Sequence, residues 1–396
     1  MKLSCLACGG QLGNTFFSIP DLPLVDSFCS SAEEALSVPC YSVDICQCSR
    51  CLTIQIASPP DTSEIYKNYI YESSSSPDLS HHFDVYAQYI ASLAISNTTH
   101  IMEIGANDGL LLSKLANAGF TSMLAIDPSP QTSHISIEGV EIINDFFSES
   151  SVSHLETNSF GIIIANNCFS HIPNLSGILS LCSKLLEPSG TIVIEVQSCL
   201  DLVEGVIFDY IYHEHYFYHT AQSFEKIARM SGLDLYHIDH VPTKGGSYRF
   251  LIGHAGQHTI DSSVSYWKYR EELAGIHKFK TWKLMENYLQ EIKKLLHKFI
   301  ENDKRRLIGY GASATGTVLM RYMNIESKVS AIVDDNPKRQ GLYAPRTAIP
   351  VNSPAALKDT DSCLILAWRH FNHIAPNLKK QSISYVLPLP TLKVSG

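Results

Sequence analysis

Five short apolar runs alternate with helical patterns between residues 98 and 255. The runs are His100–Ile104, Met123–Ile126, Val140–Ile143, Phe160–Ala165 and Thr191–Val196. Runs of this length, with helical segments such as 110–118 between them, predict an open, doubly wound α/β sheet. Ligands of such sheets bind at the carboxyl ends of the strands, so the polar residues after each run are candidate site residues.

The loop after the first run is rich in glycine. It reads Glu-Ile-Gly-Ala-Asn-Asp-Gly over residues 103–109, and it departs from the GxGxxG spacing of dinucleotide sites. Gly105 and Gly109, on either side of Asn107, allow close approach of the backbone to a ligand. We expect this loop to hold the methionine part of S-adenosylmethionine, with Glu103 accepting from loop amides or from the ammonium group.

Polar residues after the next runs fit the rest of that cofactor. Asp127 follows the second run, where a carboxylate can bind both ribose hydroxyls. Asp145 and Phe146 follow the third run and suit the adenine amine and ring face. Asn166 and Asn167 follow the fourth run, and we assign Asn166 to the cofactor and Asn167 to the substrate.

A dense set of acid–base groups follows the fifth run. Residues 211–220 read Ile-Tyr-His-Glu-His-Tyr-Phe-Tyr-His-Thr, with three histidines, one carboxylate and three phenols. Next to a methyl donor, this set predicts a methyltransferase that first removes a proton; the alternative is a histidine-rich loop at an interface. His215 is a candidate base because imidazole titrates near neutral pH. In an extended segment His213 would share its face, so the spacing leaves both open.

Cysteines are concentrated in the first 60 residues. Cys5 and Cys8 form one CxxC pair, and Cys48 and Cys51 form another. Two such pairs predict a closed, structural tetrahedral zinc site, with a small sheet in the insert. Cys46 could replace Cys48, and a group of free buried thiols is the alternative to a metal.

The chain after residue 260 contains a helical segment and a second α/β pattern. The helical segment spans 260–306 and is interrupted near Gly275. A strand at 306–310 then leads through a glycine-rich turn into a helix, and a second strand ends before Asp334. The turn has GxGxxxxG spacing, so we expect a nucleotide-containing ligand other than NAD; a purely structural turn is the alternative. The candidate residues are Tyr310, Gly311, Ala312, Ser313, Asp335 and Asn336.

Composition restricts the classes of partner. The 396 residues carry a net charge of −9, which argues against nucleic acid because phosphate binding requires a basic face. No apolar run approaches the ~20 residues needed to span a bilayer. The cysteines outside the two pairs are scattered, so we expect a cytoplasmic protein with reduced thiols and no membrane partner.

The order of these motifs resembles one family. The cysteine pairs, EIGANDG, ANNCFSHIPNL, IYHEHYFYHT, PTKGGSYR, GYGASATG and DDNPKRQG occur here in sequence. They resemble the S-adenosylmethionine-dependent C-methyltransferases of nucleotide sugars, which act on thymidine- or guanosine-diphosphate 4-keto-deoxysugars, typically at C-3', in branched-sugar synthesis. The resemblance implies a zinc-binding domain (1–65), a class I methyltransferase domain (66–258), a helical connector (259–304) and a C-terminal sugar-nucleotide domain (305–396). A monomer or weak homodimer is expected.

The resemblance also implies roles for individual residues. His215 would be the base at carbon, Glu214 would orient the sugar or an imidazole, and Tyr212 and His171 would stabilise the enolate oxygen. Further substrate-binding residues would be Tyr71, Gly246, Ser247 and Arg249. Lys244 and Thr315 depart from the family pattern, which often has histidine and lysine there. The alternatives are an O- or N-methyltransferase and a non-catalytic protein that binds S-adenosylmethionine.

Overall fold

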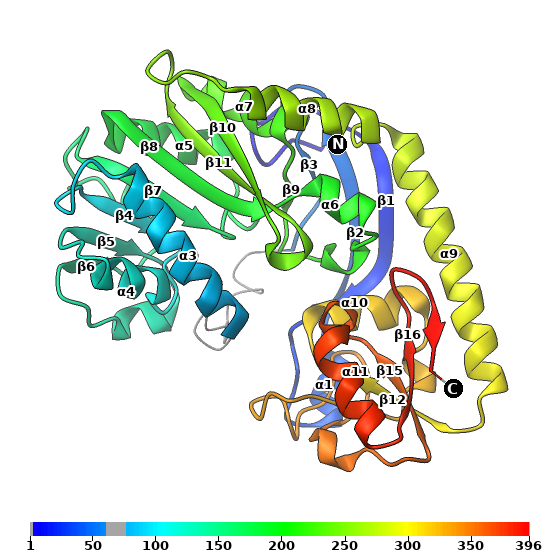
Figure 1. Ribbon diagram of the computed structural model, residues 1–396. Helices are drawn as coiled ribbons and strands as arrows, with labels where there is room; N and C mark the ends of the chain where they lie inside the picture. The colour runs from blue at the N-terminus through cyan, green and yellow to red at the C-terminus, as the bar shows by residue number, and fades with distance from the viewer. Residues whose placement is uncertain (1–2, 61–76, 396) are drawn as a thin grey trace.

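The computed structural model describes residues 3–60 and 77–395. Within these ranges the strands form three sheets of four, seven and six strands. Figure 1 shows the seven-stranded sheet and the six-stranded sheet as separate bodies, with the long hairpin of β1 and β2 running between them. In the described part of the chain, no helix combines the length and apolar composition needed to cross a bilayer.

The central sheet has the order β10-β11-β8-β7-β4-β5-β6. Strand β11 pairs antiparallel with both of its neighbours, and the other strands run parallel to one another. The strands are β4 (Ile101–Ile104), β5 (Met123–Ile126), β6 (Val140–Ile143), β7 (Phe160–Asn166), β8 (Leu186–Gln197), β10 (Leu233–Val241) and β11 (Ser247–His254). This is the class I methyltransferase arrangement, and all five predicted apolar runs are confirmed as strands.

Helices cover both faces of this sheet (Figure 1). They are α3 (Pro77–Leu93), α4 (Leu110–Asn117), α5 (Leu175–Leu185), α6 (Cys199–Glu204) and α7 (Ala221–Met230), with short 3₁₀ turns η2 (Pro130–His134), η3 (Phe208–Tyr210) and η4 (Thr243–Gly245). Buried leucines on one face of α4 and of α5 explain why these helices pack on the apolar strands. The predicted helix 110–118 is confirmed.

The first 60 residues form a small antiparallel sheet, as expected from the insert between the cysteine pairs. Its strands are β1 (Leu12–Pro23), β2 (Cys40–Cys48) and β3 (Ile54–Ile56), and α1 (Ala32–Ser37) lies in the hairpin connection. The fourth strand, β9 (Phe217–Tyr218), comes from the histidine-rich run and pairs with β3 through Ile54 and Tyr218. The segment that follows His215 is therefore part of the N-terminal sheet.

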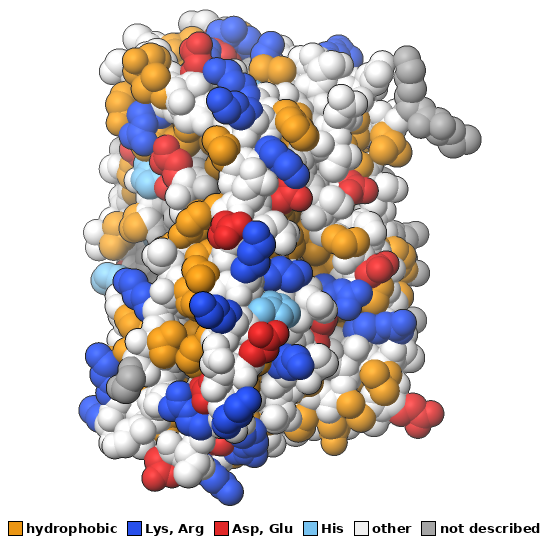
Figure 2. All heavy atoms as spheres, turned by 90° about the vertical axis from the view of Figure 1, so that its right-hand side faces the viewer, with side chains coloured by type: hydrophobic (Ala, Val, Ile, Leu, Met, Phe, Trp, Pro, Cys, Tyr) orange, Lys and Arg blue, Asp and Glu red, His pale blue; other side chains and the backbone are white. Residues whose placement is uncertain are grey.

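Two helices connect the central and C-terminal sheets. They are α8 (Ser262–Ala274) and α9 (Phe279–Asn302), and they are separated at Gly275, whose φ is +66°. The predicted interruption is confirmed, because glycine ends a helix by adopting this left-handed conformation. On the face that carries α9, lysine, arginine and acidic side chains are interspersed with single apolar side chains (Figure 2).

The C-terminal sheet has the order β14-β13-β12-β15-β16-β17. Its elements are β12 (Arg306–Tyr310), α10 (Ala314–Met323), η5 (Glu326–Lys328), β13 (Ala331–Val333), β14 (Val351–Asn352), η6 (Pro354–Ala356), β15 (Asp361–Ile365), η7 (Trp368–His370), α11 (Phe371–Lys380), β16 (Ser384–Leu387) and β17 (Lys393–Val394). Strands β14, β13, β12, β15 and β16 are parallel. The predicted strand–turn–helix–strand unit after residue 305 is confirmed.

Candidate active site

A cavity of about 620 Å³ lies at the carboxyl ends of β4, β5 and β7. Its wall is built from the loops after these strands, with Leu79 and Phe83 from α3 on one side and Lys244 on another. Six of the predicted cofactor residues line it: Glu103, Gly105, Asn107, Asp127, Phe146 and Asn166. The sheet thus brings the strand-end residues together, although they are up to 63 positions apart in sequence.

Two predicted cofactor residues do not line the cavity. Gly109 is the N-cap of α4, with φ +75°, and a β-carbon there would lie 3.0 Å from the Ile135 side chain. Asp145 is exposed, and its carboxylate accepts a hydrogen bond from the amide of Phe146 at 2.7 Å. Gly109 therefore acts through the shape of the loop, and Asp145 stands beside the cavity rather than in its wall.

Buried acceptors at the floor of the cavity fit a cationic group. Oε2 of Glu103 and Oδ1 of Asn166 are buried and have no hydrogen-bond partner among the described residues, while Nδ2 of Asn166 donates to Oε1 of Glu103 at 3.4 Å. Burial raises the pKa of Glu103 to about 8. An unpaired buried carboxylate is costly, and an ammonium group of a ligand would compensate for it. The methionyl part of S-adenosylmethionine carries such a group.

Asp127 is fixed at the cavity wall by the backbone. Its Oδ2 accepts from the amide of Asn107 at 3.0 Å, and its Oδ1 accepts from the amide of Ser129 at 2.7 Å. The carboxylate therefore ties the glycine loop after β4 to the loop after β5. Each oxygen retains a lone pair for a further donor, as required for binding to ribose hydroxyls.

Replacing Asp127 by alanine is expected to weaken S-adenosylmethionine binding by ~1–3 kcal/mol, the scale of lost charged hydrogen bonds. Titration calorimetry measures this loss, and thermal unfolding checks that the loops remain folded. Glu141→Ala, at an exposed position of β6, is the control and should bind as the wild type does. Unchanged affinity of Asp127→Ala would assign the ribose to another part of the wall.

His215 lies in a smaller recess that adjoins the cavity. Asn167 and Lys244 line both spaces, while Gln197, Tyr210 and His215 line the recess. Nδ1 of His215 donates to the carbonyl of Tyr210 at 2.7 Å, so the neutral ring carries its lone pair on Nε2. Burial lowers the pKa of His215 well below its usual range, which keeps that lone pair available at neutral pH.

Three rings surround His215. The centroid of Tyr212 lies 4.2 Å from that of His215, the His171 centroid lies 5.0 Å away, and the Tyr210 ring stacks at 5.6 Å with an interplanar angle of 14°. The structure thus brings together three of the four predicted catalytic residues, Tyr212, His171 and His215. Their contacts fix the imidazole orientation.

The hydrogen bonding of His171 argues against its predicted role at an enolate oxygen. Its Nδ1 donates to the carbonyl of Glu214 at 2.7 Å, and burial lowers its pKa to about 4. A neutral imidazole has one N–H, so the ring has no second proton to donate to an oxyanion.

The expectation that His213 and His215 share one face is wrong. Residues 213 and 214 form a turn rather than an extended segment, so the two rings diverge. His213 is 1% exposed, and its Nε2 donates to the carbonyl of Tyr41 in the N-terminal sheet at 3.0 Å. It lines neither space, and His215 is left as the candidate base.

The Glu214 side chain also lines neither space. Burial is the main cause that raises the pKa of Glu214 to about 8. The negative charge of Asp26 adds to this shift, and the positive charge of Arg339 opposes it. Asp26 and Arg339 form an ion pair at 2.7 Å that joins the β1–β2 connection to the C-terminal domain. Glu214 is therefore placed toward the domain junction, and its role in orienting a sugar stays a prediction.

Two of the predicted substrate residues after β10 form hydrogen bonds within the protein. Arg249 is buried, pairs with Glu195 through Nη2 at 2.8 Å and Nε at 3.2 Å, and stacks on Tyr86 at 4.1 Å. Ser247 is fully buried, and its hydroxyl donates to the carbonyl of Thr243 at 3.0 Å.

This pairing argues against the assignment of Arg249 to the substrate, because its guanidinium balances a buried carboxylate, and the assignment stays a prediction. Gly246 lines neither space and shapes the turn after β10. Tyr71 lies outside the described residues.

The glycine turn of the C-terminal domain is closed partly by its own carboxylates. The amide of Ala312 donates to Asp334 at 2.6 Å, and the hydroxyl of Tyr310 donates to Asp335 at 3.0 Å. Ser313 caps α10 by accepting from the amide of Gly316 at 3.1 Å. Asp335 and Asn336 are exposed. The exposed side chains of Asp335 and Asn336 could accept hydrogen bonds from ribose hydroxyls. The Ala312 amide already donates to Asp334 and is not available to a phosphate. Nucleotide binding at this turn stays a prediction.

A buried ion pair behind His215 had no signal in the sequence. Asp209 is 0% exposed and accepts from Arg369 at 2.8 and 3.0 Å and from Nε1 of Trp368 at 2.8 Å. The Arg369 guanidinium also lies 4.4 Å from the centroid of the Tyr210 ring. Because the partners are 160 positions apart, only the tertiary fold shows that the C-terminal domain supports the residue that holds His215.

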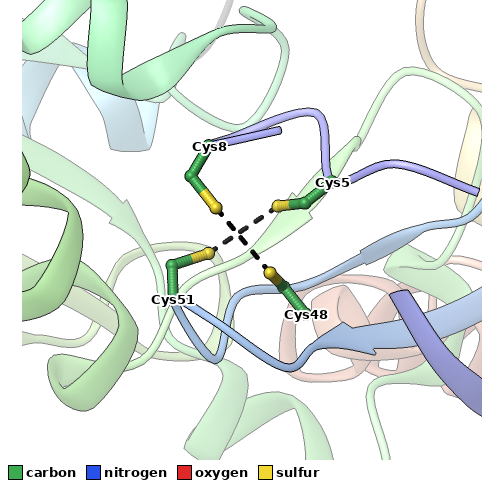
Figure 3. Close-up of side chains that lie close together, drawn as sticks. All are labelled: Cys5, Cys8, Cys48 and Cys51. Carbon is green, nitrogen blue, oxygen red and sulfur yellow. Dashed lines mark hydrogen bonds between the residues drawn. The ribbon is translucent and has the colours of Figure 1, made fainter. Parts of the chain in front are cut away.

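The four paired cysteines converge on one point (Figure 3). Sγ of Cys5 lies 3.7 Å from Sγ of Cys51, Sγ of Cys8 lies 3.7 Å from Sγ of Cys48, and all four lie within 4.8 Å of one another. A zinc–sulfur distance of about 2.3 Å gives a tetrahedral edge of ~3.8 Å, so the residues fit this metal.

Two neighbours of the cluster agree with a thiolate site. A β-carbon at Gly10 would lie 2.9 Å from Sγ of Cys48, so the turn leaves no room for a side chain there. Burial raises the pKa of Cys8 to about 11, so this sulfur would be a thiolate at neutral pH only with a cation bound to it. Cys46 instead contacts the hydroxyl of Thr15 at 3.6 Å, which removes it as a substitute for Cys48.

Comparison with known proteins finds methyltransferases over most of the chain. The C-methyltransferase C-terminal domain family matches residues 242–390, and a methyltransferase domain family matches residues 79–238. The chain is 24% identical to the C-methyltransferase NovU of Streptomyces niveus over 406 residues, covering 98% of this chain and 96% of that protein.

Two solved structures are weaker neighbours. The CurJ carbon methyltransferase is 18% identical with a TM-score of 0.34, covering 47% of this chain and 57% of that one. The plantazolicin methyltransferase BpumL in complex with SAH is 17% identical with a TM-score of 0.37, covering 50% and 91%. Similarities this low carry no argument about function.

The domain match over the C-terminal part and the full-length match to NovU both name carbon as the methylated atom. They favour C-methylation over the O- or N-methyltransferase and the non-catalytic binding protein considered above. The matches together support the activity of an S-adenosylmethionine-dependent C-methyltransferase for this chain.

Proposed function

We propose that this enzyme methylates a carbon next to the ketone of a nucleoside-diphosphate 4-keto-deoxysugar, with C-3' as the methylated position. The observation that carries the proposal is the placement of His215 in a recess that shares walls with the cofactor cavity. A carbon that bears only hydrogen is not a nucleophile, whereas a neighbouring ketone makes its proton removable by a positioned base.

His215 takes the proton from the carbon next to the ketone. Its Nδ1 keeps the hydrogen bond to the Tyr210 carbonyl throughout, so Nε2 receives the proton and the resulting imidazolium is stabilised by that carbonyl. Glu103, Asn166 and Asp127 would hold S-adenosylmethionine in the cavity, where it supplies the electrophilic methyl group. Apolar side chains, among them Phe83, Ile104 and Phe147, line the cavity and would pack against the bound cofactor.

The C-terminal domain is proposed to hold the nucleotide of the substrate. In support, the glycine turn and the acceptors Asp335 and Asn336 lie at the carboxyl ends of the parallel strands β12 and β13, where ligands of such sheets bind. A nucleoside-diphosphate sugar should bind the full-length protein, and NADH should give no saturable fluorescence change. Tight stoichiometric NADH binding would contradict this assignment.

The reaction is tested by incubating the protein and labelled S-adenosylmethionine with thymidine- and guanosine-diphosphate 4-keto-6-deoxyhexoses. Without methyl donor, deuterium from solvent should enter the sugar only next to the ketone. Because a C-4' ketone acidifies both C-3' and C-5', NMR of the product must identify the methylated carbon. Methyl transfer to oxygen, or no exchange with any of these sugars, would refute the proposal.

We also propose that Cys5, Cys8, Cys48 and Cys51 bind one structural zinc ion. Metal analysis of purified protein should find about one zinc per chain, as for a single tetrahedral thiolate site. Cys8→Ser should lose the metal and lower the unfolding temperature, since metal binding is coupled to folding. Cys46→Ser is the matched control and should retain both. Zinc-free protein with the wild-type unfolding temperature would rule the site out.

A further inference from the structure

The loop between β10 and β11 places an unpaired cation at the junction of the cavity and the recess. Lys244 lines both spaces, and among the described residues that line them it carries the only ammonium or guanidinium group. Within the described chain no carboxylate forms an ion pair with it, and only its backbone carbonyl is hydrogen-bonded, to Gln197 at 3.2 Å. A partly buried cation with no counterion requires a compensating negative charge.

The carboxylate whose charge acts on Lys244 already has other partners. Glu195 accepts from Arg249, from His82 at 2.6 Å and from the hydroxyl of Thr243 at 3.2 Å. Glu195 therefore acts on Lys244 only at longer range. The charge of Lys244 helps to lower the pKa of His171 and of His215. The other titratable groups that line the two spaces with it are Glu103, Asp127, Cys168, Cys199, Tyr210 and Tyr218.

The backbone at Lys244 is in a conformation that suits glycine. Its φ is +54°, and Gly245 and Gly246 follow with φ +88° and +126°. A β-carbon at Gly245 would lie 2.6 Å from the Ile207 side chain, and one at Gly246 would overlap the Asp201 carboxylate. The turn is thus fixed against its neighbours. A long side chain with positive φ costs conformational energy, and such positions are typical of functional sites.

We propose that Lys244 is a catalytic residue whose ammonium group stabilises the enolate oxygen formed when His215 removes the proton. The inference rests on the proposed function, because it requires a ketone substrate. It also fills a role left open by the geometry, since neutral His171 has no second proton to donate and Tyr212 lines neither space.

The electron and proton balance is complete without another reactant. The C–H electron pair forms the enolate double bond while the proton passes to His215, and the carbonyl oxygen becomes an anion next to Lys244, which keeps its protons. The enolate carbon then takes the methyl group, and the carbon–sulfur electron pair returns to the sulfur. A fixed cation next to the carbonyl oxygen lowers the barrier to proton removal, because negative charge develops on that oxygen in the transition state.

The test compares Lys244→Met, Lys244→Arg and Lys244→Gly with the wild type. Solvent deuterium exchange and methyl transfer are measured separately, on thymidine- and guanosine-diphosphate 4-keto-6-deoxyhexoses. Lys244→Met should slow both steps on the order of 10²-fold, as for loss of one oxyanion donor, with unchanged S-adenosylmethionine affinity. Lys244→Gly should be equally slow but unfold at the wild-type temperature or higher, because glycine suits this φ. Lys184→Met, at an exposed position in α5, should match the wild type.

The pH profile separates a charge effect from a structural one. Burial lowers the pKa of Lys244 to about 8, so its charge is present below that pH and lost above it. The wild-type rate should fall as pH rises through about 8, and this limb should disappear in Lys244→Arg, whose guanidinium stays charged.

Three results would overturn the inference. Wild-type exchange rates in Lys244→Met would refute the role of Lys244 and leave the proposed function standing. Loss of S-adenosylmethionine binding in proportion to loss of rate would assign the ammonium to the cofactor instead. Absence of exchange by the wild type on every sugar would overturn the proposed function and this role together.

Discussion

Replacing His215 by asparagine is expected to slow methyl transfer by about 10²–10⁴-fold, the usual cost of losing a general base. The asparagine amide can still donate to the Tyr210 carbonyl, so the recess keeps its shape. His215 does not line the cofactor cavity, and S-adenosylmethionine should therefore bind with unchanged affinity in calorimetry. Deuterium exchange at the sugar carbon should fall in parallel with methyl transfer.

The matched control is His213→Asn, two positions earlier. Its ring contacts Tyr41 of the N-terminal sheet, so the variant should retain the wild-type exchange rate per folded molecule. If His215→Asn exchanges the proton at the wild-type rate but cannot methylate, His215 is not the base. In that case Tyr212 and Glu214 become the candidates to test.

Replacing Arg369 by alanine is expected to lower the free energy of unfolding by about 3–5 kcal/mol, because it leaves a buried charge uncompensated. Asp209 would lose the two contacts from Arg369 and keep the hydrogen bond from Trp368. Urea unfolding followed by tryptophan fluorescence measures the loss. Methyl transfer should also decline, since the guanidinium packs on Tyr210, whose carbonyl orients His215.

A double variant distinguishes the ion pair from general disruption of the junction. Arg369→Met combined with Asp209→Asn removes both charges and should recover most of the lost stability. Lys294→Ala, which breaks an exposed pair with Glu291 on α9, should leave the transition unchanged. An Arg369→Ala protein that unfolds at the wild-type urea concentration would contradict the predicted importance of the pair.

Local sequence patterns predicted most of the fold because each central strand is a short apolar run followed by a turn. The rule that strand ends share one edge then collected Glu103, Asp127 and Asn166 in one cavity. The prediction that His213 and His215 share one face was wrong, because the chain turns at residues 213 and 214 instead of staying extended. The His213 side chain therefore points to the N-terminal sheet. It also could not distinguish Arg249 as a partner of buried Glu195 from Arg249 as a substrate ligand, since this depends on strand pairing between β8 and β11.

Contacts between distant segments were beyond any local pattern. Asp209 and Arg369 belong to different domains, and neither stands in a recognisable motif. Lys244 was visible only as a departure from a family pattern, because a single lysine in a loop is most often solvated. Its position at the junction of two spaces depends on how η4 packs against the end of β8. Such placements follow from tertiary packing, which overrides local preference.

The pairing of β3 with β9 has a consequence for how the chain folds during synthesis. Ile54 cannot pair until Tyr218 has been synthesised. Asp26 cannot form its ion pair until Arg339, 313 positions later, has been synthesised. The β1–β2 hairpin is therefore among the first parts to leave the ribosome and among the last to be covered. Contacts of such long range make folding slow and leave apolar strand edges exposed to association in the meantime. Early capture of a metal by the four cysteines would close the base of this hairpin while the rest of the chain is still being made.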